Sequence, residues 1–223
     1  MKKIVPFALV VFVTTTSFIL TKKVVKNLTQ EEGILEKVAN AHGFQNWGNV
    51  KEIKFTFNVD RDTSHFERTW IWKPRTNDIT AITPEKTLTY NWADMDSVAY
   101  KTNGGFINDK FWLLAPFQLQ WDADNVTHEH ILVSEAPISK KPMQKLTIAY
   151  GSEGGYTPGD AYDFYFGEDY IIREWVFRKA NQKEPSLITS FETYEETKGL
   201  KVATMHQTGD GSFKLYFTGL EVK

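Results

Sequence analysis

The clearest structural signal in this chain is the segment YDFYFGEDYIIREWVF, residues 162–177. Apolar residues alternate along both halves, and Gly167-Glu168-Asp169-Tyr170 separates the halves, which is the pattern of a β-hairpin. A two-residue loop at Glu168-Asp169 predicts that Phe166 pairs with Ile171, Phe164 with Arg173, and Tyr162 with Trp175. One face of the hairpin then carries these residues together with Phe177, around Arg173. Such a face is too apolar for solvent, so we expect it to meet a core or a ligand.

The same register places two carboxylates in direct opposition. Asp163 lies opposite Glu174, and like charges facing each other across a hairpin are unfavourable. Either a cation such as an Arg side chain lies between them, or the register differs from the one predicted. The sequence leaves this choice open.

Strand patterns continue on both sides of the hairpin. Ile53 to Val59 alternates apolar and polar residues, and Phe66, Arg68, Trp70 and Trp72 share one face of the next strand. Further short strands are predicted at 87–92, 97–100, 126–134, 143–150, 187–194, 200–207 and 213–222. About ten short strands with few helices predict a mainly β (α+β) fold. We expect a strongly curved antiparallel sheet or an incomplete β-barrel.

Two helices complete this prediction. Thr29 and Glu32 form a capping box for an N-terminal helix with an Ile34, Leu35, Val38 and Ala41 stripe, which Gly43 ends. After a break at Gly104-Gly105, a short helix capped by Asn108 or Asp109 carries Phe111-Trp112-Leu113-Leu114 and ends at Pro116. The short helix would cover or fill the concave side of the sheet, either as core or as a movable lid.

The first residues are typical of a membrane-targeting segment. Lys2 and Lys3 precede the uncharged run 4–21, which would span roughly 27 Å as a helix, just short of the bilayer core of about 30 Å. Residues 1–23 are therefore predicted to be a signal peptide or signal anchor, and 28–223 a single domain. We expect a periplasmic or secreted protein cut near Ser17, or alternatively a protein anchored to the inner membrane by residues 4–21.

Composition excludes several classes of function. The chain has no cysteine, which rules out disulfides, Cys nucleophiles and a lipidated cysteine after the leader. The net charge is −2 and no basic stripe is present, which argues against nucleic acid.

No catalytic motif, cofactor motif or metal site is predicted. There is no Gly-x-Ser-x-Gly elbow and no phosphate-binding glycine loop. His128 and His130 share a strand face but lack a third ligand, and the acids Asp160, Asp163, Glu168 and Asp169 lack the spacing of a calcium loop.

Two arginines lie on predicted aromatic strand faces. Arg68 and Arg173 could each pack their stems on aromatic rings and reach water. Alternatively, either could anchor a phosphate or carboxylate headgroup above an apolar cavity.

Four segments together resemble an uncharacterised family of bacterial envelope proteins that carries no known activity. They are Ala41-His42-Gly43 with Trp47, the strand 53–59, the segment 106–112 (FINDKFW) and the segment 159–163 (GDAYD). The layout, with its leader, N-terminal helix and curved sheet, also resembles the periplasmic lipoprotein-carrier (LolA/LolB-like) fold. That resemblance implies an incomplete barrel whose apolar cavity holds acyl chains, and it transfers no binding residue.

We therefore hypothesise an exported envelope protein that binds a hydrophobic ligand, a lipid or the acyl chain of a lipoprotein, and performs no chemistry. Membrane contact would occur through the N-terminal segment if it is uncleaved. The expected ligand-binding residues are Phe55, Phe57, Arg68, Trp70, Trp72, Phe111 and Trp112, with Arg68 at the cavity mouth. The alternatives are an envelope hydrolase and a structural or interaction module with a fully packed core.

Overall fold

The computed structural model describes residues 32–61 and 63–223, and residues 33–223 form one compact unit. The predicted leader 1–23 and Thr29 lie outside the described residues. Within the described residues, no helix is both long and apolar enough to cross a membrane.

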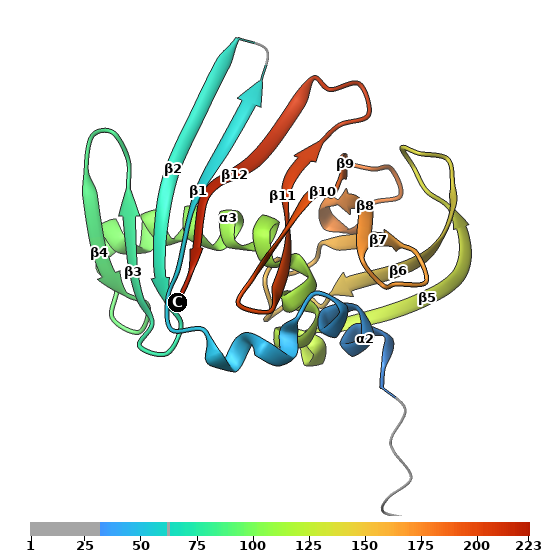
Figure 1. Cartoon of the computed structure of the whole chain (residues 1–223), viewed down its shortest axis with the longest axis horizontal. Coiled ribbons are helices and arrows are strands. Elements are labelled where there is room, and N and C mark those ends of the chain that lie inside the picture. Colours follow the sequence, from blue (N-terminus) through green and yellow to red (C-terminus); the bar gives the residue numbers. More distant parts are fainter. Residues whose placement is uncertain (1–31, 62) are drawn as a thin grey trace, which may run out of the picture. The chain divides into compact units, whose positions relative to one another are not determined.

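Twelve strands form two antiparallel sheets in this unit (Figure 1). The seven-stranded sheet has the order β10-β11-β12-β1-β2-β3-β4, and the five-stranded sheet has the order β5-β6-β7-β8-β9. The larger sheet contains β1 (Ile53–Arg61), β2 (Ser64–Lys73), β3 (Asp78–Ile82), β4 (Thr87–Asn91), β10 (Glu192–Thr197), β11 (Leu200–Gln207) and β12 (Phe213–Val222). The smaller sheet contains β5 (Val126–Glu135), β6 (Pro142–Tyr150), β7 (Ala161–Phe166), β8 (Ile172–Arg178) and β9 (Leu187–Ser190).

The predicted fold class, mainly β with antiparallel strands in an open arrangement, is confirmed. The strands are divided between two sheets, and one predicted strand, 187–194, is interrupted at Phe191. Its first part, β9, pairs with β8, and its second part, β10, pairs with β11. The strand β3 was not predicted.

A single long helix, α3 (Ser97–Trp121), packs against both sheets and supplies side chains to two cores. Ala99, Phe106 and Leu114 pack with the seven-stranded sheet, whereas Phe111 and Leu119 pack with the five-stranded sheet. Figure 1 shows α3 in green, crossing behind the strands of the larger sheet. Because both sheets need this helix to cover their apolar faces, it is buried on most sides.

The structure corrects the prediction for this region. Residues 97–100 begin α3 instead of forming a strand, and Gly104-Gly105 lies inside the helix. Asp96 is the N-cap, where its Oδ1 accepts a hydrogen bond from the Ala99 amide at 2.7 Å. Pro116 does not end the helix; instead, Leu114 has non-helical angles (φ −118°, ψ 24°) and marks a kink. Proline has no N–H to continue the ladder, which explains a bend at this point.

The N-terminal helix α2 (Ile34–Ala41) begins later than predicted. The helix begins at Ile34 with Gly33 as its N-cap, so Glu32 lies before the helix and the capping box that included Glu32 is wrong. The predicted stop at Gly43 is correct, since Gly43 has φ +90° and leads into the 3-10 helix η1 (Phe44–Asn49). A Cβ on Gly43 would lie 1.9 Å from the Gly199 carbonyl oxygen, so only glycine allows this contact with the β10–β11 hairpin.

The β7–β8 hairpin has a register other than the predicted one. Tyr162 pairs with Phe177 and Phe164 with Trp175, and a shift between Tyr165 and Phe166 brings Phe166 opposite Ile172. The loop spans residues 167–171 instead of two residues, with Tyr170 at φ +56°.

Asp163 and Glu174 are therefore not opposed. Asp163 forms an ion pair with Arg178 and accepts a hydrogen bond from Thr147 at 2.7 Å. Glu174 accepts hydrogen bonds from the Ile138 and Ser139 amides, at 2.6 and 3.0 Å. Arg173 lies at the shifted part of β8, where it is 41% exposed and pairs with Asp169 at 2.7 Å.

Candidate functional site

A groove of about 630 Å3 lies between the edge of the seven-stranded sheet and the first turns of α3. Its apolar floor comes from one row of cross-strand neighbours, because Trp70 of β2 pairs with Ala81 of β3 and Ala81 pairs with Leu88 of β4. Residues in such a row point to the same side of a sheet. The small side chain of Ala81, between two larger ones, leaves room above it.

The rim of the groove is apolar and accessible. Phe66 on β2 is 48% exposed and Val98 on α3 is 49% exposed, whereas Trp70 and Ala81 on the floor are only 1% and 6% exposed. Among the described residues, only five large apolar side chains are strongly exposed, and these two line the same groove. An apolar ligand would therefore meet exposed side chains first and buried ones deeper in the groove.

Arg68 lines the groove, but its charge is already paired. Nε donates to Asp109 Oδ2 at 2.5 Å and Nη2 donates to Oδ1 at 2.7 Å, a bidentate contact with a carboxylate that is fully buried. The indole Nε1 of Trp70 also donates to Asp109 Oδ2, at 2.8 Å. Burial of a carboxylate requires such partners. Arg68 thus serves first to compensate Asp109, and its use as a free headgroup anchor is not favoured by this geometry.

Gly105 allows the backbone of α3 to approach the Arg68–Asp109 ion pair closely. A Cβ on Gly105 would lie 2.5 Å from Arg68 Nη1 and 2.8 Å from Cζ. The carbonyl oxygen of Gly105 also accepts a hydrogen bond from Arg68 Nη2 at 3.3 Å. The helix therefore carries glycine here because the guanidinium packs directly on its backbone.

The other predicted ligand-binding residues lie in packed cores outside the groove lining. Phe55, Phe57 and Trp72 belong to the core of the seven-stranded sheet, where Phe55 contacts Phe217 at a centroid distance of 5.7 Å. Phe111 belongs to the core of the five-stranded sheet and stacks on Tyr156 at 3.8 Å. Trp112, half-buried, packs against both cores. Of the seven residues, the structure brings only Arg68 and Trp70 together at the groove.

Sequence reasoning missed most of the groove. Ala81 and Leu88 line it from β3 and β4, and Val98, Lys101 and Thr102 line it from α3. The alternation of Ile79 and Ala81 within residues 78–82 was a usable signal for β3. The helical residues had no usable signal, because the segment 97–105 has strand-like and glycine-rich composition.

The cations of the groove have no acidic counterpart in its lining. Lys86, in the turn between β3 and β4, and Lys101 on α3 are both exposed, and the polar uncharged residues of the lining are Thr83, Ser97 and Thr102. No Asp or Glu is among the lining residues in the part of the chain that the structure describes. The site thus combines an apolar floor with positive charge at its edge.

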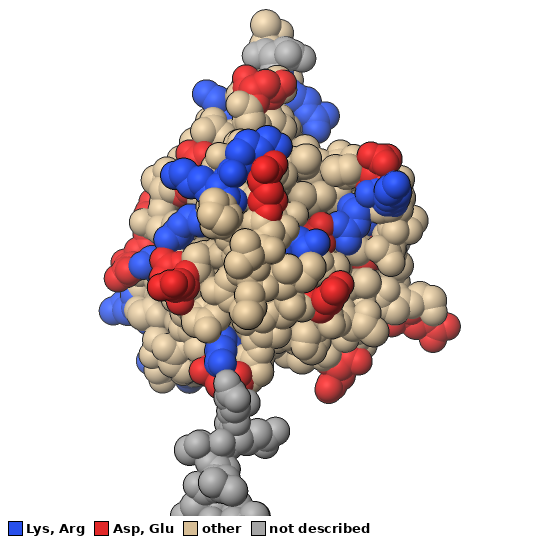
Figure 2. Space-filling view, turned by 90° about the vertical axis from the view of Figure 1, so that its right-hand side faces the viewer, with Lys and Arg blue, Asp and Glu red and all other residues tan. Residues whose placement is uncertain are grey.

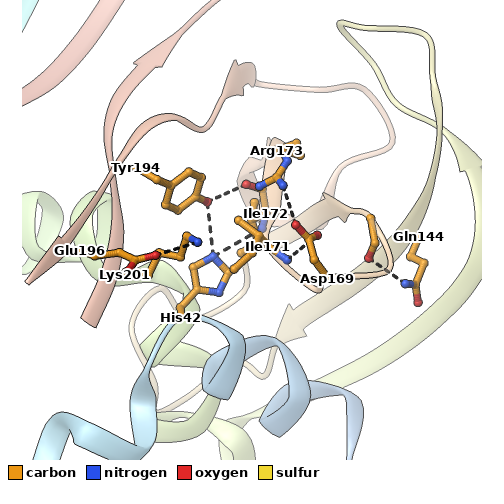
Figure 3. A network of polar contacts seen from close by, with 10 residues as sticks. His42, Gln144, Asp169, Ile171, Ile172, Arg173, Tyr194, Glu196 and Lys201 are labelled. Atoms are coloured by element: carbon orange, nitrogen blue, oxygen red, sulfur yellow. Dashed lines mark hydrogen bonds and ion pairs between the residues drawn. The ribbon is translucent and has the colours of Figure 1, made fainter. Parts of the chain in front are cut away.

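A second buried network, around His42, is structural. Figure 3 shows His42 at the end of α2, pointing toward Tyr194 of β10 and Ile172 of β8. Nδ1 donates to the Val38 carbonyl at 2.8 Å, so Nε2 is left to accept from the Ile172 amide at 3.4 Å. The Tyr194 hydroxyl donates to the Ile172 carbonyl at 2.6 Å. Burial lowers the pKa of His42 to about 4, so the ring is neutral at pH 7 and links α2 to both sheets.

A buried lysine also occupies the core of the larger sheet. Lys110 Nζ lies 4.8 Å from the ring centroid of Trp121 and within 5.7 Å of those of Trp72 and Trp92. It donates to Gln118 Oε1 at 3.2 Å, across the kink of α3. Burial lowers the pKa of Lys110 to about 8. The cation–π contacts and this hydrogen bond compensate the buried charge and tie the two parts of α3 together.

The hydrolase alternative draws little support from the histidines. His65 lies with Asp60, Ser64 and Ser212 around a polar pocket at two hairpin tips. However, its Nδ1 contacts Asp60 at 2.7 Å and its Nε2 contacts Glu67 at 3.5 Å, so carboxylates flank both nitrogens. The Ser64 hydroxyl donates to the Arg61 carbonyl instead, at 2.8 Å. This arrangement does not pair a serine with a base.

Metal chemistry is not indicated in the part of the chain that the structure describes, where no three His, Asp or Glu side chains gather as ligands. The Nε2 atom of His130, on β5, contacts Gln144 Oε1 at 2.9 Å. Of the acids near turns, Asp160 accepts a hydrogen bond from the Ala180 amide at 2.8 Å, and Asp163 and Asp169 pair with arginines. These contacts are the ordinary ones of turns and sheet edges.

The side of the unit on which β5 lies shows no single-sign patch. In Figure 2, Lys, Arg, Asp and Glu side chains are interspersed around an uncharged centre. Leu132 and Val133 of β5 are 71% and 73% exposed, next to a register shift in the β5–β6 pairing. This side therefore offers no basic stripe for a phosphate backbone.

Comparisons with known proteins return similar structures but no sequence family. No family model matches the chain, and no curated protein matches its sequence. A crystal structure of a LolA superfamily protein from Nitrosomonas europaea has a TM-score of 0.48 and 11% identity, covering 85% of this chain and 92% of that chain.

Two further structures match at a similar level. One is a putative outer membrane lipoprotein-sorting protein domain from Vibrio parahaemolyticus (TM-score 0.45, 8% identity, 86% of this chain and 93% of that chain). The other is a DUF1329 family protein from Desulfovibrio piger (TM-score 0.45, 9% identity, 84% and 92%). One of the matched structures is described as a LolA superfamily protein, the fold that the sequence layout resembled. Neither the ligands nor the partners of those proteins follow for this chain from a similarity at this level.

Proposed function

We propose that this protein is an exported envelope protein that binds a hydrophobic ligand, such as the acyl chain of a lipid or lipoprotein, in the groove beside α3. The observation that carries the proposal is the row formed by Trp70, Ala81 and Leu88, which forms the floor of the groove beside the exposed side chains of Phe66 and Val98. Exposed and buried apolar side chains that form one continuous surface are typical of a ligand site.

The size of the groove supports a small ligand or part of a larger one. Its volume of about 630 Å3 falls within the usual range for small-molecule sites, roughly 300–1,000 Å3. Burial of eight methylene groups would contribute about 6 kcal/mol before ordering costs. Such a contribution corresponds to a dissociation constant of tens of micromolar or weaker, an affinity suited to a carrier that must also release its ligand.

Binding without catalysis is the function that this geometry supports. Among the described residues, the ion pair at the groove is that of Arg68 with Asp109, which stabilises a buried carboxylate. The groove lining contains no histidine. A hydrophobic ligand or a lipoprotein is therefore the proposed partner, without nucleic acid and without a cofactor.

The proposal is tested with delipidated protein and the neutral fluorophore N-phenyl-1-naphthylamine, whose emission rises in apolar sites. The test variant is Val98→Trp, which places a large side chain over the groove from an exposed position of α3. Val133→Trp is the matched control, because Val133 is also an exposed valine, on β5 and outside the groove lining. We expect the wild type and Val133→Trp to bind the fluorophore alike and Val98→Trp to bind at least about tenfold more weakly, a difference of about 1.4 kcal/mol.

Two results would contradict the proposal. One is a double negative result: the delipidated wild-type protein does not bind the fluorophore, and mass spectrometry detects no lipid in the natively purified wild-type protein. The other is equal binding by Val98→Trp and Val133→Trp, which would place the apolar site elsewhere.

A further inference from the structure

We propose that the groove selects amphiphiles with an anionic headgroup, and that Lys86 and Lys101 recognise this headgroup. The inference rests on the proposed binding of an apolar chain in the groove and names the chemical class of the ligand. The sequence indicated Arg68 for recognition of the headgroup, whereas this proposal assigns that role to Lys86 and Lys101.

The charge of the lining is one-sided. The described residues that line the groove include three cations and no carboxylate. Arg68 is neutralised by Asp109 through two hydrogen bonds. Among the residues that the structure describes, no ion pair involves Lys86 or Lys101. Two ammonium groups therefore remain beside an apolar surface without a partner of opposite charge.

The two lysines enter the groove lining from different elements. Lys86 belongs to the β3–β4 turn, where its carbonyl accepts a hydrogen bond from the Thr83 amide at 2.9 Å. Lys101 lies on the second turn of α3, one turn beyond Val98. Each lysine is thus near an apolar lining residue, since Leu88 on β4 lies two residues beyond Lys86. A ligand chain on the row of Trp70, Ala81 and Leu88 would bring its headgroup within reach of both flexible side chains.

The polar surroundings also suit an anion. Ser97 adds a hydroxyl donor to the lining, whereas the hydroxyls of Thr83 and Thr102 already donate to the carbonyls of Lys86 and Val98. The first turns of α3 present the positive end of the helix dipole. The nearest acids in the sequence are Glu85 and Asp96. Asp96 is occupied as the N-cap of α3, and Glu85 is not among the lining residues. A neutral or cationic headgroup would leave the two ammonium groups without compensation.

The experiment compares ligands that share a chain and differ in the head. Dodecanoate, dodecyl phosphate and neutral dodecanol displace N-phenyl-1-naphthylamine from delipidated protein at pH 8, where the carboxylate is ionised. The variant Lys86→Gln/Lys101→Gln removes both charges. The control, Lys141→Gln/Lys183→Gln, removes two exposed charges outside the groove lining.

We expect the wild type and the control to bind dodecanoate roughly fivefold more tightly than dodecanol, as two solvent-exposed charge interactions allow. Lys86→Gln/Lys101→Gln should bind both ligands equally, with its dodecanol affinity unchanged. Added salt should reduce the preference in the wild type. A larger preference for dodecyl phosphate than for dodecanoate would identify phosphate as the recognised group, and the reverse would identify carboxylate.

The failures of the two proposals are distinguishable. Equal wild-type affinities for dodecanol and dodecanoate would overturn the headgroup inference and leave the apolar site intact. Retention of the anion preference by Lys86→Gln/Lys101→Gln would overturn the assignment to these lysines. Absence of binding by the fluorophore and all three ligands, checked by calorimetry, would overturn the proposed function together with this inference.

Discussion

Arg68 shows how one residue supports two interpretations that only the structure separates. An arginine on an aromatic strand face fits a ligand anchor, and its guanidinium does lie over Phe57, Phe66 and Trp70 at 5.2–5.6 Å. The deciding partner, Asp109, is 41 residues away in the sequence. Sequence patterns within one strand carry no information on such a partner, and neither interpretation included the ion pair that engages its charge.

Loss of Arg68 should destabilise the protein strongly. Arg68→Met leaves the fully buried Asp109 carboxylate without its cation, and removal of one member of a buried pair costs about 3–5 kcal/mol. Urea unfolding measures this loss. Lys54→Met is the control, because Lys54 pairs with Glu221 at the surface and its loss should cost less than about 1 kcal/mol. Equal losses in the two variants would contradict the role assigned to Asp109.

His206 should make the protein sensitive to acid. Burial lowers its pKa to about 3, whereas an unfolded histidine titrates near 6.5. Between these values the unfolded state binds more protons, so the free energy of unfolding falls as the pH falls from 6.5 toward 3. At pH 4.5 the contribution is about 2–3 kcal/mol. We expect His206→Phe to lose less stability between pH 7 and pH 4.5 than the wild type in urea unfolding at both pH values. Equal losses would contradict the assignment of a neutral buried ring.

At the scale of elements, α3 is the feature that the sequence concealed. Gly104-Gly105 and Pro116 are residues that interrupt helices, and they led to a prediction of a break and a short helix. Because the helix is covered on both sides by sheets, its apolar residues show no single stripe that would reveal a helical period. Tertiary packing outweighs local propensity here.

The two adjacent glycines of α3 should respond to substitution in opposite directions. Gly104→Ala meets nothing within 4 Å and should stabilise the helix by about 1 kcal/mol. Gly105→Ala should destabilise the protein by about 1–3 kcal/mol, because its methyl group would collide with the Arg68 guanidinium. The difference in the urea midpoint between these matched variants measures the effect. Stabilisation by both alanines would show that α3 does not pack against Arg68.

The β7–β8 hairpin illustrates what sequence can and cannot fix in a sheet. The two strands and their apolar face were predictable from alternation, whereas the register was not. The unfavourable opposition of Asp163 and Glu174 in the predicted register indicated that this register could be wrong. A register shift and a left-handed Tyr170 resolve it, and neither has a strong sequence signal.

For the compact unit 33–223, the sequence supports the fold class and most strands but not the division into two sheets. That division depends on where Phe191 interrupts a strand and on which helix fills the space, and both are long-range properties. The lining of the groove also depends on long-range contacts. Trp70 and Arg68 were predictable from one strand, whereas Ala81, Leu88 and Val98 join them only through pairing and helix packing.

Ligand binding should also raise the stability of the unit. A ligand that binds only the folded state at about 100 times its dissociation constant adds roughly 2.7 kcal/mol. We expect dodecanoate to raise the Tm of the wild type and of Val133→Trp, and to leave the Tm of Val98→Trp nearly unchanged. A rise of equal size in all three proteins would indicate binding outside the groove.

The most direct test of the central claim is methyl NMR of delipidated protein during titration with dodecanol. If the groove is the binding site, the methyl signals of Ala81, Leu88 and Val98 should shift and saturate together, while those of Leu132 and Val133 on β5 stay in place. Shifts confined to β5, or no saturable shift at the groove, would contradict the account.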